Sequence, residues 1–489
     1  MKQKWTRFCS MLMLCCLLLG VLPGRAAAAG FRDVPAGHWA GDSITRCASL
    51  DFFQGKTADT FGLGQSMTRA AAVVVLDRFF GWEDAAVKLP YTDVPADAWY
   101  AEALRSAYAQ GVATAQTRAF RPNAPITREE LAVMLIRALG YTQIAGVAQE
   151  LPRTFTDISS SEGYIAMARD LGLVSGLRTD TFAPDNYATR EQVAVILMRL
   201  YDKLNTRVGG VMGIVSSASE MTGLTVAAVD NCTVRSNGTV YTSLGSTQVK
   251  RLKSAAETAG AELLLYAAGE DLPEDTAALA EDLAGLVEKD GYDGLLLELP
   301  AATAEEYARL TALVSALRAT LGQSKLHLIL TLPEADDLQA SCTALASAAD
   351  GVVLRIEQKV RLAGGFPVAP VEALEEVYLA VAGLRCAGVE AAKISVMLTT
   401  QGVHYVGAEA RGHLDSWEVS RKQNSGWTYG YSERYGCAWL EHGANEAIWY
   451  LDGRSATERV RLLDMLGTGG IWLEEIGAVS GEVLTALRG

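Results

Sequence analysis

One pattern recurs three times in the first 205 residues and restricts the fold of this chain more than any other feature. Each copy opens with an aromatic residue and an aspartate two positions later, and it ends with a Thr-Arg pair that starts a run of helical periodicity. The openings are FRDVPAGHWA at residue 31, YTDVPADAWY at 91 and FTDISSSEGY at 155; the Thr-Arg pairs begin at Thr68, Thr127 and Thr189. A period of about sixty residues indicates one structural unit repeated in tandem.

Each Thr-Arg pair carries the signals of a helix start. In the second copy Thr127 is a suitable N-cap, and Glu130, three residues on, completes a capping box. In the third copy Thr189 and Gln192 form the same pair. The first copy has Ala71 in place of the returning side chain, so we expect a weaker cap there. Apolar residues then follow on one helical face, in the second copy Leu131, Met134, Leu135 and Ala138. The pattern predicts an all-α region.

These motifs resemble the S-layer homology family over all of residues 31 to about 205. The resemblance implies three repeats at 31–85, 91–145 and 152–205, arranged as a pseudo-threefold spindle that binds secondary cell-wall polysaccharide, often a pyruvylated one. Carried over by motif, the groove arginines are Arg69, Arg128 and Arg190. Trp39 and Trp99 are the aromatic members of the implied site.

The chemistry of these side chains suits an acidic sugar, although a structural role is the alternative for each. A guanidinium offers a planar fork of donors to a carboxylate, and an indole offers a flat apolar face to a sugar ring. The tryptophans are also candidates for core residues, which the sequence favours, and the arginines for solvated side chains. A cation beside a helix N-terminus opposes the helix dipole, so its recurrence favours a binding role. The third copy has Tyr164 near the Trp position.

The N-terminus and the charge balance indicate export. Lys2, Lys4 and Arg7 precede an apolar run over residues 8–22, and small residues follow, which predicts a signal peptide at 1–29 cleaved near Ala28 or Ala29 rather than a membrane-spanning helix or a lipoprotein signal. Removing its four positive residues leaves 57 acidic residues against about 39 basic ones, so nucleic acid is not an expected partner. The remaining cysteines lack metal-type spacing and are expected to be buried free thiols: Cys47, Cys232, Cys342, Cys386 and Cys437. No cofactor or metal site is predicted.

Beyond residue 205 the pattern changes to apolar runs that alternate with amphipathic segments. This order predicts parallel strands joined by crossover helices. Eight runs qualify as strands, at 211–215, 224–229, 262–267, 294–299, 326–332, 351–356, 393–398 and 470–474. Eight such units over residues 210–489 predict an α/β TIM-type (β/α)8 barrel, whose working face lies at the carboxyl ends of the strands.

Two stretches of this region resemble glycoside hydrolase family 18. They are YDGLLLELP at 292–300, similar to the family's strand-four signature, and AIWYLDGRSATERVRLLDMLGTGGIWLEEIG at 447–477, similar to the family's final segment. The resemblance implies a general acid at the last signature position, where this chain has Pro300, with Glu298 at the substrate-positioning acid and Leu296 at the earlier aspartate. Proline has no proton to donate, so the expected loss is several powers of ten in rate.

Other pocket positions of the family also differ here. Strand six supplies Arg355 and Glu357, and Glu474 aligns with the family's floor tryptophan, while we expect strand alternation to aim Trp472 away from the lumen. Glu298, Glu357 and Glu474 are the candidate catalytic residues if the barrel is active. The alternative, which the sequence favours, is that they are solvated rim residues or ion-pair partners of Arg355.

The sequence therefore predicts an exported protein of the cell wall with a non-catalytic barrel that binds or scaffolds wall glycan. One alternative is an active hydrolase of N-acetylglucosamine-containing glycan such as peptidoglycan, with Glu298 as its acid. A second alternative is a spacer that contacts protein partners in a surface layer. The segment 401–446 is rich in Trp, Tyr and His, and it is either an exposed glycan-gripping surface or a small buried core.

Overall fold

The computed structural model describes residues 30–114, 117–152, 154–333 and 336–488. The predicted signal peptide lies outside these ranges. Within them, no helix is both long and apolar enough to cross a membrane. The chain forms two compact units: residues up to 127 together with 187–198 make the first, and residues 128–186 together with 199–489 make the second.

The repeat region is built on helices, and helices of neighbouring copies pack against one another. They are α2 (Gly41–Ser49), α3 (Arg69–Phe80), α4 (Ala101–Ala109), α5 (Arg128–Ala138), α6 (Thr142–Ala148), α7 (Glu162–Asp170) and α8 (Arg190–Asn205). A helix follows each Thr-Arg pair, as predicted. The caps differ in detail: the Thr68 hydroxyl accepts from Ala71 N at 3.2 Å, whereas in the third copy Gln192 accepts from Thr189 N at 3.1 Å and the Thr189 hydroxyl is buried without a partner.

The prediction of an all-α region is wrong, because short antiparallel bridges join the copies just before these helices. The bridges pair Ser66 with Thr189, Thr68 with Pro125, and Thr127 with Tyr187. Within them Met67 N donates to Ala188 O at 2.9 Å, Ala188 N to Ile126 O at 3.0 Å, and Ile126 N to Met67 O at 2.8 Å, so the three equivalent residues close a ring of hydrogen bonds. Helical periodicity reports only local spacing and cannot reveal single extended residues that pair with a distant copy.

The expected barrel is present, with all eight predicted strands. They are β1 (Gly210–Val215), β2 (Val226–Val234), β4 (Glu262–Ala268), β5 (Gly294–Glu298), β6 (Lys325–Thr331), β7 (Gly351–Arg355), β10 (Ile394–Leu398) and β16 (Gly470–Leu473). Neighbours pair in parallel around the ring, and β1 closes it by pairing with both β16 and β2. The short strand β3 (Val240–Thr242) adds an antiparallel hairpin to β2.

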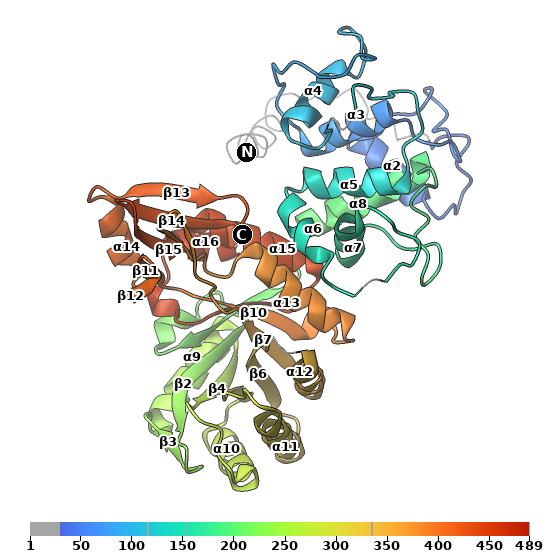
Figure 1. Ribbon diagram of the computed structural model, residues 1–489. Helices are drawn as coiled ribbons and strands as arrows, with labels where there is room; N and C mark the ends of the chain where they lie inside the picture. Colours follow the sequence, from blue (N-terminus) through green and yellow to red (C-terminus); the bar gives the residue numbers. More distant parts are fainter. Residues whose placement is uncertain (1–29, 115–116, 153, 334–335, 489) are drawn as a thin grey trace, which may run out of the picture. The chain divides into compact units, whose positions relative to one another are not determined.

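Helices surround the barrel, as Figure 1 shows for α10, α11 and α12 outside the strands. In chain order they are α9 (Ser246–Ala259), α10 (Thr276–Asp290), α11 (Ala304–Thr320), α12 (Asp336–Ala348), α13 (Leu374–Cys386), α15 (Gly453–Leu466) and α16 (Gly481–Arg488). Only a 3-10 turn, η1 (Ala218–Met221), connects β1 to β2. Two further 3-10 turns, η2 (Ala391–Lys393) and η3 (Ile476–Ala478), flank β10 and β16.

The lumen is filled by apolar side chains contributed by all eight strands. They are Met212, Ile214, Val226, Ala228, Leu264, Leu296, Ile329, Val353, Met397 and Trp472, with Tyr266 packed against them. Trp472 is fully buried, so the expectation that it points away from the lumen is wrong. Glu474 lies two residues further along and shares its parity, which places Trp472 in the core and Glu474 at the mouth.

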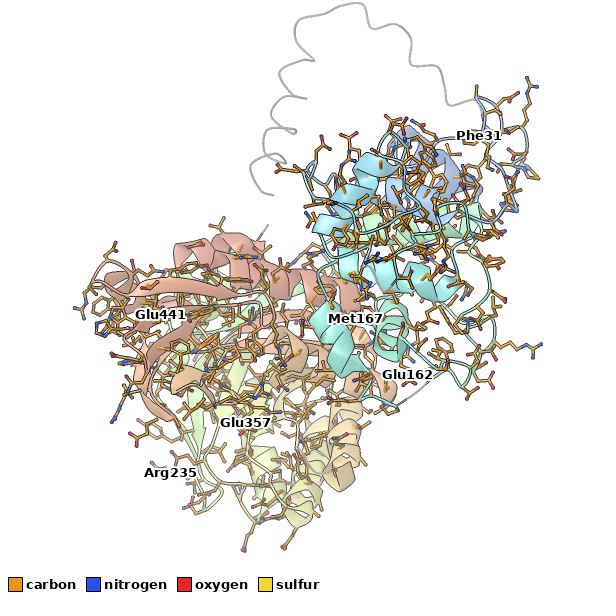
Figure 2. All side chains as sticks on the ribbon, turned by 45° about the horizontal axis from the view of Figure 1, so that its top comes forward. Phe31, Glu162, Met167, Arg235, Glu357 and Glu441 are labelled. Atoms are coloured by element: carbon orange, nitrogen blue, oxygen red, sulfur yellow. The ribbon has the colours of Figure 1, made fainter. Side chains whose placement is uncertain are left out.

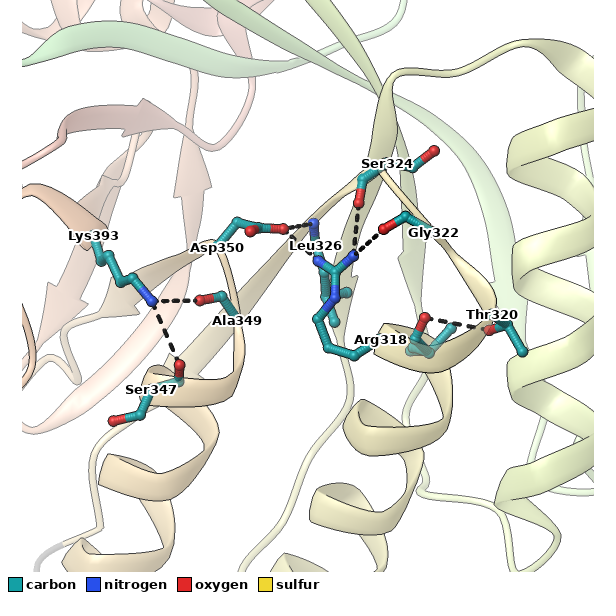
Figure 3. Close-up of polar contacts among 10 residues, drawn as sticks. Arg318, Thr320, Gly322, Ser324, Leu326, Ser347, Ala349, Asp350 and Lys393 are labelled. Atoms are coloured by element: carbon teal, nitrogen blue, oxygen red, sulfur yellow. Dashed lines mark hydrogen bonds and ion pairs between the residues drawn. The ribbon is translucent and has the colours of Figure 1, made fainter.

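The opposite, amino-terminal end of the barrel is tied together by a polar network (Figure 3). Arg318 on α11 forms an ion pair with Asp350 and donates to the carbonyls of Ser324 and Gly322 at 3.0 and 3.2 Å. Asp350 also accepts from Leu326 N at 2.8 Å, and Lys393 donates to Ala349 O at 3.1 Å. These contacts hold the turns that lead into β6, β7 and β10, a role in stability rather than in a working site.

The segment after β10 is a separate antiparallel sheet inserted before α15. Its strands, in spatial order, are β12 (Glu409–Leu414), β11 (Gly402–Val406), β15 (Glu446–Tyr450), β14 (Cys437–His442) and β13 (Thr428–Ser432). One face packs on the hairpin of β8 (Arg361–Ala363) and β9 (Phe366–Val368), and the other packs near α14 (Ser416–Gln423). Both faces are thereby covered, which gives the insertion two small apolar cores.

Candidate functional sites

The arginine that opens the second helix of each repeat contacts a phenylalanine of another repeat. Arg69 Nε donates to Phe120 O at 2.8 Å, Arg128 Nε to Phe182 O at 3.0 Å, and Arg190 Nε to Phe61 O at 2.8 Å. In each case the guanidinium also lies over the ring of that phenylalanine, 4.5 to 5.1 Å from its centroid. The sequence identified the arginines, but it gave no sign that they hold the loops of a different copy.

The three arginines differ in burial. Arg190 is 8% exposed, and its Nη2 donates to Gln54 O at 2.8 Å; Arg128 is partly exposed, and its Nη2 donates to Ser175 O at 2.7 Å. Burial lowers the pKa of both groups, although nearby carboxylates, Asp33 for Arg190 and Asp157 for Arg128, act in the opposite direction. These contacts pair each cation with the dipoles of backbone carbonyls.

The aspartate at the opening of each repeat holds the same phenylalanine loops from the other side. Asp33 accepts from the backbone N–H groups of Phe61, Gly62 and Leu63 at 2.7 to 3.0 Å. Asp93 and Asp157 each accept from two such groups, at 2.7 to 2.9 Å. Burial alone would raise the pKa of Asp33, but the hydrogen bonds from Leu63, Phe61 and Gly62 outweigh it and lower that pKa.

Trp39 and Trp99 lie on the surface, with exposed fractions of 63% and 69%. The alternative that they are core residues is therefore wrong, and their ring faces are accessible. Tyr164, near the corresponding position of the third copy, is only partly exposed and lies under Arg137, whose Cζ is 5.4 Å from the ring centroid. The aromatic surface is thus present in two of the three copies.

At the mouth of the barrel, two of the three candidate acids meet through one arginine. Arg355 Nε donates to Glu298 Oε1 at 2.9 Å, and Arg355 Nη1 donates to Glu474 Oε1 at 2.6 Å. Tyr266 OH donates to Glu298 Oε2 at 2.5 Å. The sequence analysis did not single out Tyr266, although it shares the inward parity of its strand with Leu264. Glu298 is therefore held by two donors, in agreement with the ion-pair alternative.

The charges of Glu298 and Glu474 shift the pKa values of the neighbouring Arg355 and Tyr266. Burial would lower the pKa of Arg355, but the adjacent carboxylates of Glu298 and Glu474 outweigh it and raise that pKa. Burial and the charge of Glu298 both raise the pKa of Tyr266, which keeps the phenol protonated and donating.

An open cleft of about 1030 Å³ lies beside this group, at the carboxyl ends of β2, β4, β5 and β6. Glu298 and Pro300 line it together with Arg235 and Asn237 from the β2–β3 hairpin and Glu270 after β4. Glu357 does not join Glu298 and Glu474: it is exposed and lines a second cleft, of about 420 Å³, with Lys359 and Arg355. Figure 2 labels Arg235 and Glu357, which come from different loops.

The aromatic residues of the insertion divide between surface and core. Trp417 and Tyr429 are exposed, with Arg421 over the Trp417 ring at 5.3 Å and Tyr429 OH donating to Asp452 at 3.0 Å. Trp439 packs against Trp449 with ring centroids 5.2 Å apart, in one of the two small cores. The buried-core alternative therefore holds for Trp439 and Trp449, whereas Trp417 and Tyr429 lie on the surface.

Four of the five described cysteines are buried, as expected, and Cys386 is exposed. Burial raises the pKa of the Cys47, Cys232 and Cys437 thiols to about 12, which leaves them protonated and unreactive at neutral pH.

The S-layer homology domain pattern matches this chain three times, at residues 30–73, 90–132 and 154–194. Over its first third the chain is similar to an amylopullulanase of Thermoanaerobacterium thermosulfurigenes (31% identity over 35% of this chain and 10% of that protein). It is also similar to a cell surface protein of Thermoanaerobacter kivui (31%, covering 36% and 22%) and an S-layer protein of Bacillus thuringiensis subsp. finitimus (25%, covering 41% and 25%). The chain spans no more than a quarter of the length of these relatives.

Among solved structures, the fold is similar to a chitinase of Chromobacterium violaceum, with 16% identity and a TM-score of 0.48 over 57% of this chain and 98% of that one. The C-terminal domain of a putative chitinase from Desulfitobacterium hafniense aligns with 13% identity and a TM-score of 0.48, over 58% of this chain and 98% of the other.

The first third of the chain thus consists of S-layer homology domains, as predicted. The protein that carries them is a protein of the cell surface.

Proposed function

We propose that the three repeats hold this protein non-covalently to a secondary cell-wall polysaccharide that carries carboxylate groups. The observation that carries the proposal is the recurrence of one arginine at the start of the second helix in each matched domain, with its Nε bound to a carbonyl in all three. The carbonyl and the phenylalanine ring fix the orientation of the fork, and fixed donors bind a planar anion more tightly than mobile ones. Exposed Trp39 and Trp99 supply apolar faces for sugar rings.

Sedimentation with purified cell walls tests the anchoring. The mature chain is expected to pellet with walls that keep their polysaccharide, and to stay in solution when the polymer is removed or its carboxylates are converted to amides. Arg69→Lys keeps the charge but loses the fork, and we expect about tenfold weaker pelleting. A protein that pellets equally with native and amidated walls would rule out carboxylate recognition.

Two triple alanine variants separate specific binding from general charge attraction: one replaces Arg69, Arg128 and Arg190, and the matched control replaces three arginines elsewhere in the repeats. Arg32, Arg118 and Arg178 are exposed and come one from each copy. The triple alanine variant of these three should sediment nearly as the unchanged protein does, whereas a general electrostatic attraction would weaken both sets of variants alike.

For the barrel, we propose a non-catalytic role in binding or scaffolding wall glycan. The pairing of Glu298 with both Arg355 and Tyr266 supports it, together with Pro300 at the position where the family 18 resemblance implies the general acid. The large cleft beside them offers a surface with polar and apolar residues that a sugar chain can use.

An active hydrolase is the second candidate, because Glu298 lines the cleft despite its ion pair. Incubation with peptidoglycan separates the two candidates. Release of reducing sugar that is lost in Glu298→Gln would establish hydrolysis, and retention of glycan without release would support the binding role. A chain that neither retains nor cleaves glycan would favour a spacer that contacts protein partners.

A further inference from the structure

Helices α6 and α7, which precede the third Thr-Arg pair, are packed on the barrel rather than separated from it. Residues 128–186 belong to the same compact unit as residues 199–489. Within that unit α6 packs against α13 of the barrel, and α7 packs against α6. The α6–α7 contact is so close that a side chain on Gly163 would overlap the carbonyl oxygen of Ala145. The buried residues of α6 are apolar: Ile144, Ala145 and Ala148.

A buried carboxylate at the end of α7 forms the polar centre of this contact. Asp170 is 8% exposed, and its Oδ2 accepts from the hydroxyl of Tyr378, a fully buried residue of α13, at 2.8 Å. Arg169 donates to Asp170 Oδ1 at 2.6 and 2.9 Å, and Arg385 of α13 donates to the Asp170 backbone carbonyl at 2.8 Å. A buried charge requires such partners, so separating the surfaces would leave Tyr378 without its acceptor.

A second contact lies at α15. The guanidinium of Arg461 lies over the ring of Tyr141, with 5.4 Å between Cζ and the ring centroid, and Tyr141 is only 2% exposed. Burial raises the pKa of this phenol to about 12, the largest effect on the group. Tyr141 immediately precedes α6, so both ends of the α6–α7 pair are fixed to barrel helices.

The connection between α8 and β1 is itself fixed to the end of α15. Asp464 accepts from the backbone N–H groups of Val208 and Gly209 at 3.2 Å each and pairs with Arg207 at 3.2 Å. Lys203, in the last turn of α8, donates to the carbonyl of Met465 at 2.7 Å. A flexible linker would leave its backbone in water, whereas this one has specific partners on the barrel.

We infer that residues 128–186 and the barrel form one cooperative body, whose interface joins α6 and α7 to α13 and α15 and is centred on Asp170 and Tyr378. Residues 128–186 are thus a permanent partner of the barrel, and the domain boundary expected near residue 205 is not a point of independent motion. This interface does not depend on what the repeats or the cleft bind.

Cutting the connection tests the inference in the full chain. A protease recognition sequence inserted between Asn205 and Thr206 allows the chain to be cleaved there after folding, which leaves the repeats and the barrel as two fragments. We expect the two fragments to elute together in gel filtration at micromolar concentration. Fragments that elute apart from the folded, cleaved protein would overturn the inference, because a flexible connection predicts that result.

Substitutions at the polar centre locate the interface. Tyr378→Phe removes the hydroxyl donor to Asp170, and we expect the dissociation constant of the cleaved fragments to rise about tenfold. Tyr429→Phe is the matched control, since it removes another tyrosine–carboxylate hydrogen bond outside the interface and should leave the constant unchanged. An equal effect of the two would place the interface elsewhere. If Tyr378→Phe does not fold, elution of the unsubstituted cleaved chain still decides the question.

Discussion

The repeats and the barrel mouth both depend on arginine, but they use its charge in opposite ways. In the repeats, the guanidinium nitrogens of Arg128 and Arg190 bind backbone carbonyls, which orient the group without neutralising it. At the barrel mouth, Arg355 lies between the carboxylates of Glu298 and Glu474 and forms ion pairs with both. An arginine held by dipoles remains attractive to an external anion, whereas one held by two anions does not.

The difference explains why the same kind of residue supports a binding proposal in one region and argues against catalysis in the other. What matters is the partner of the charge and not its presence in a motif. Four sets of substitutions test the contrast, from the largest expected effect to the smallest.

Arg190→Ala should cost the most stability. It removes two hydrogen bonds to carbonyls and a cation packed over Phe53 and Phe61, at a site almost closed to water. We expect the free energy of unfolding to fall by about 2–4 kcal/mol, measured by urea denaturation. Arg69→Ala, at a more exposed equivalent position, should cost clearly less. Equal losses would mean that the buried Arg190 and the more exposed Arg69 contribute alike to stability, which would contradict the expectation.

Arg355→Met should destabilise the barrel at neutral pH by leaving two carboxylates close together without their cation. The three side chains keep between a quarter and two fifths of their surface in water, so we expect a loss of about 1–3 kcal/mol. The loss should shrink at high salt, because mobile ions screen the repulsion between the two carboxylates. Arg454→Met, which breaks an exposed pair with Glu433, is the control and should cost little. A loss that does not depend on salt would indicate lost packing instead of lost charge pairing.

Asp33→Ala tests the contribution of the aspartate at the opening of the first repeat. Because the folded-state pKa of Asp33 lies below its ordinary value of 3.8, the carboxylate contributes stability above that value, and this contribution is lost as the pH falls through the lowered pKa. We expect a loss of about 1–2 kcal/mol at pH 7 that disappears at pH 2. Unfolding curves at the two pH values give the comparison. A difference that persists in acid would show that the hydrogen bonds do not depend on ionisation.

Trp39→Ala and Trp99→Ala should change stability least, by less than about 0.5 kcal/mol, because both rings are exposed. Wall sedimentation should nevertheless weaken if these rings contact sugar. Leu177→Ala, at an exposed apolar position of the third copy, is a suitable control for both measurements. Unchanged sedimentation of both tryptophan variants would confine the recognition to the arginines.

Local spacing was sufficient for most of the secondary structure. The eight strands followed from apolar runs such as 294–299 and 326–332, since a buried parallel strand needs little more than such a run and flanking turns. The helix starts followed from Thr68, Thr127 and Thr189, since capping is a local interaction. The three S-layer homology matches agree with the repeat that these residues define.

Contacts between distant residues could not be predicted in the same way. The bridges at Met67, Ile126 and Ala188 join three copies about sixty residues apart, and no helical period marks them. Trp472 was misplaced because the alternation along its strand was assigned with the wrong phase, although Trp472 has the same parity as Glu474. Whether Glu298 faced a substrate or a cation depended on Arg355, 57 residues away, and the two possibilities differ only in three dimensions.

The ring in which Met67, Ala188 and Ile126 exchange backbone hydrogen bonds also limits how such a gene can evolve. Each copy donates to one neighbour and accepts from the other, so the circle closes with three members. Deletion of one copy would open it and leave a buried donor and a buried acceptor unsatisfied. Duplication of a single copy would add a member for which the circle has no place. Gain or loss of this anchor is therefore expected to occur in whole sets of three.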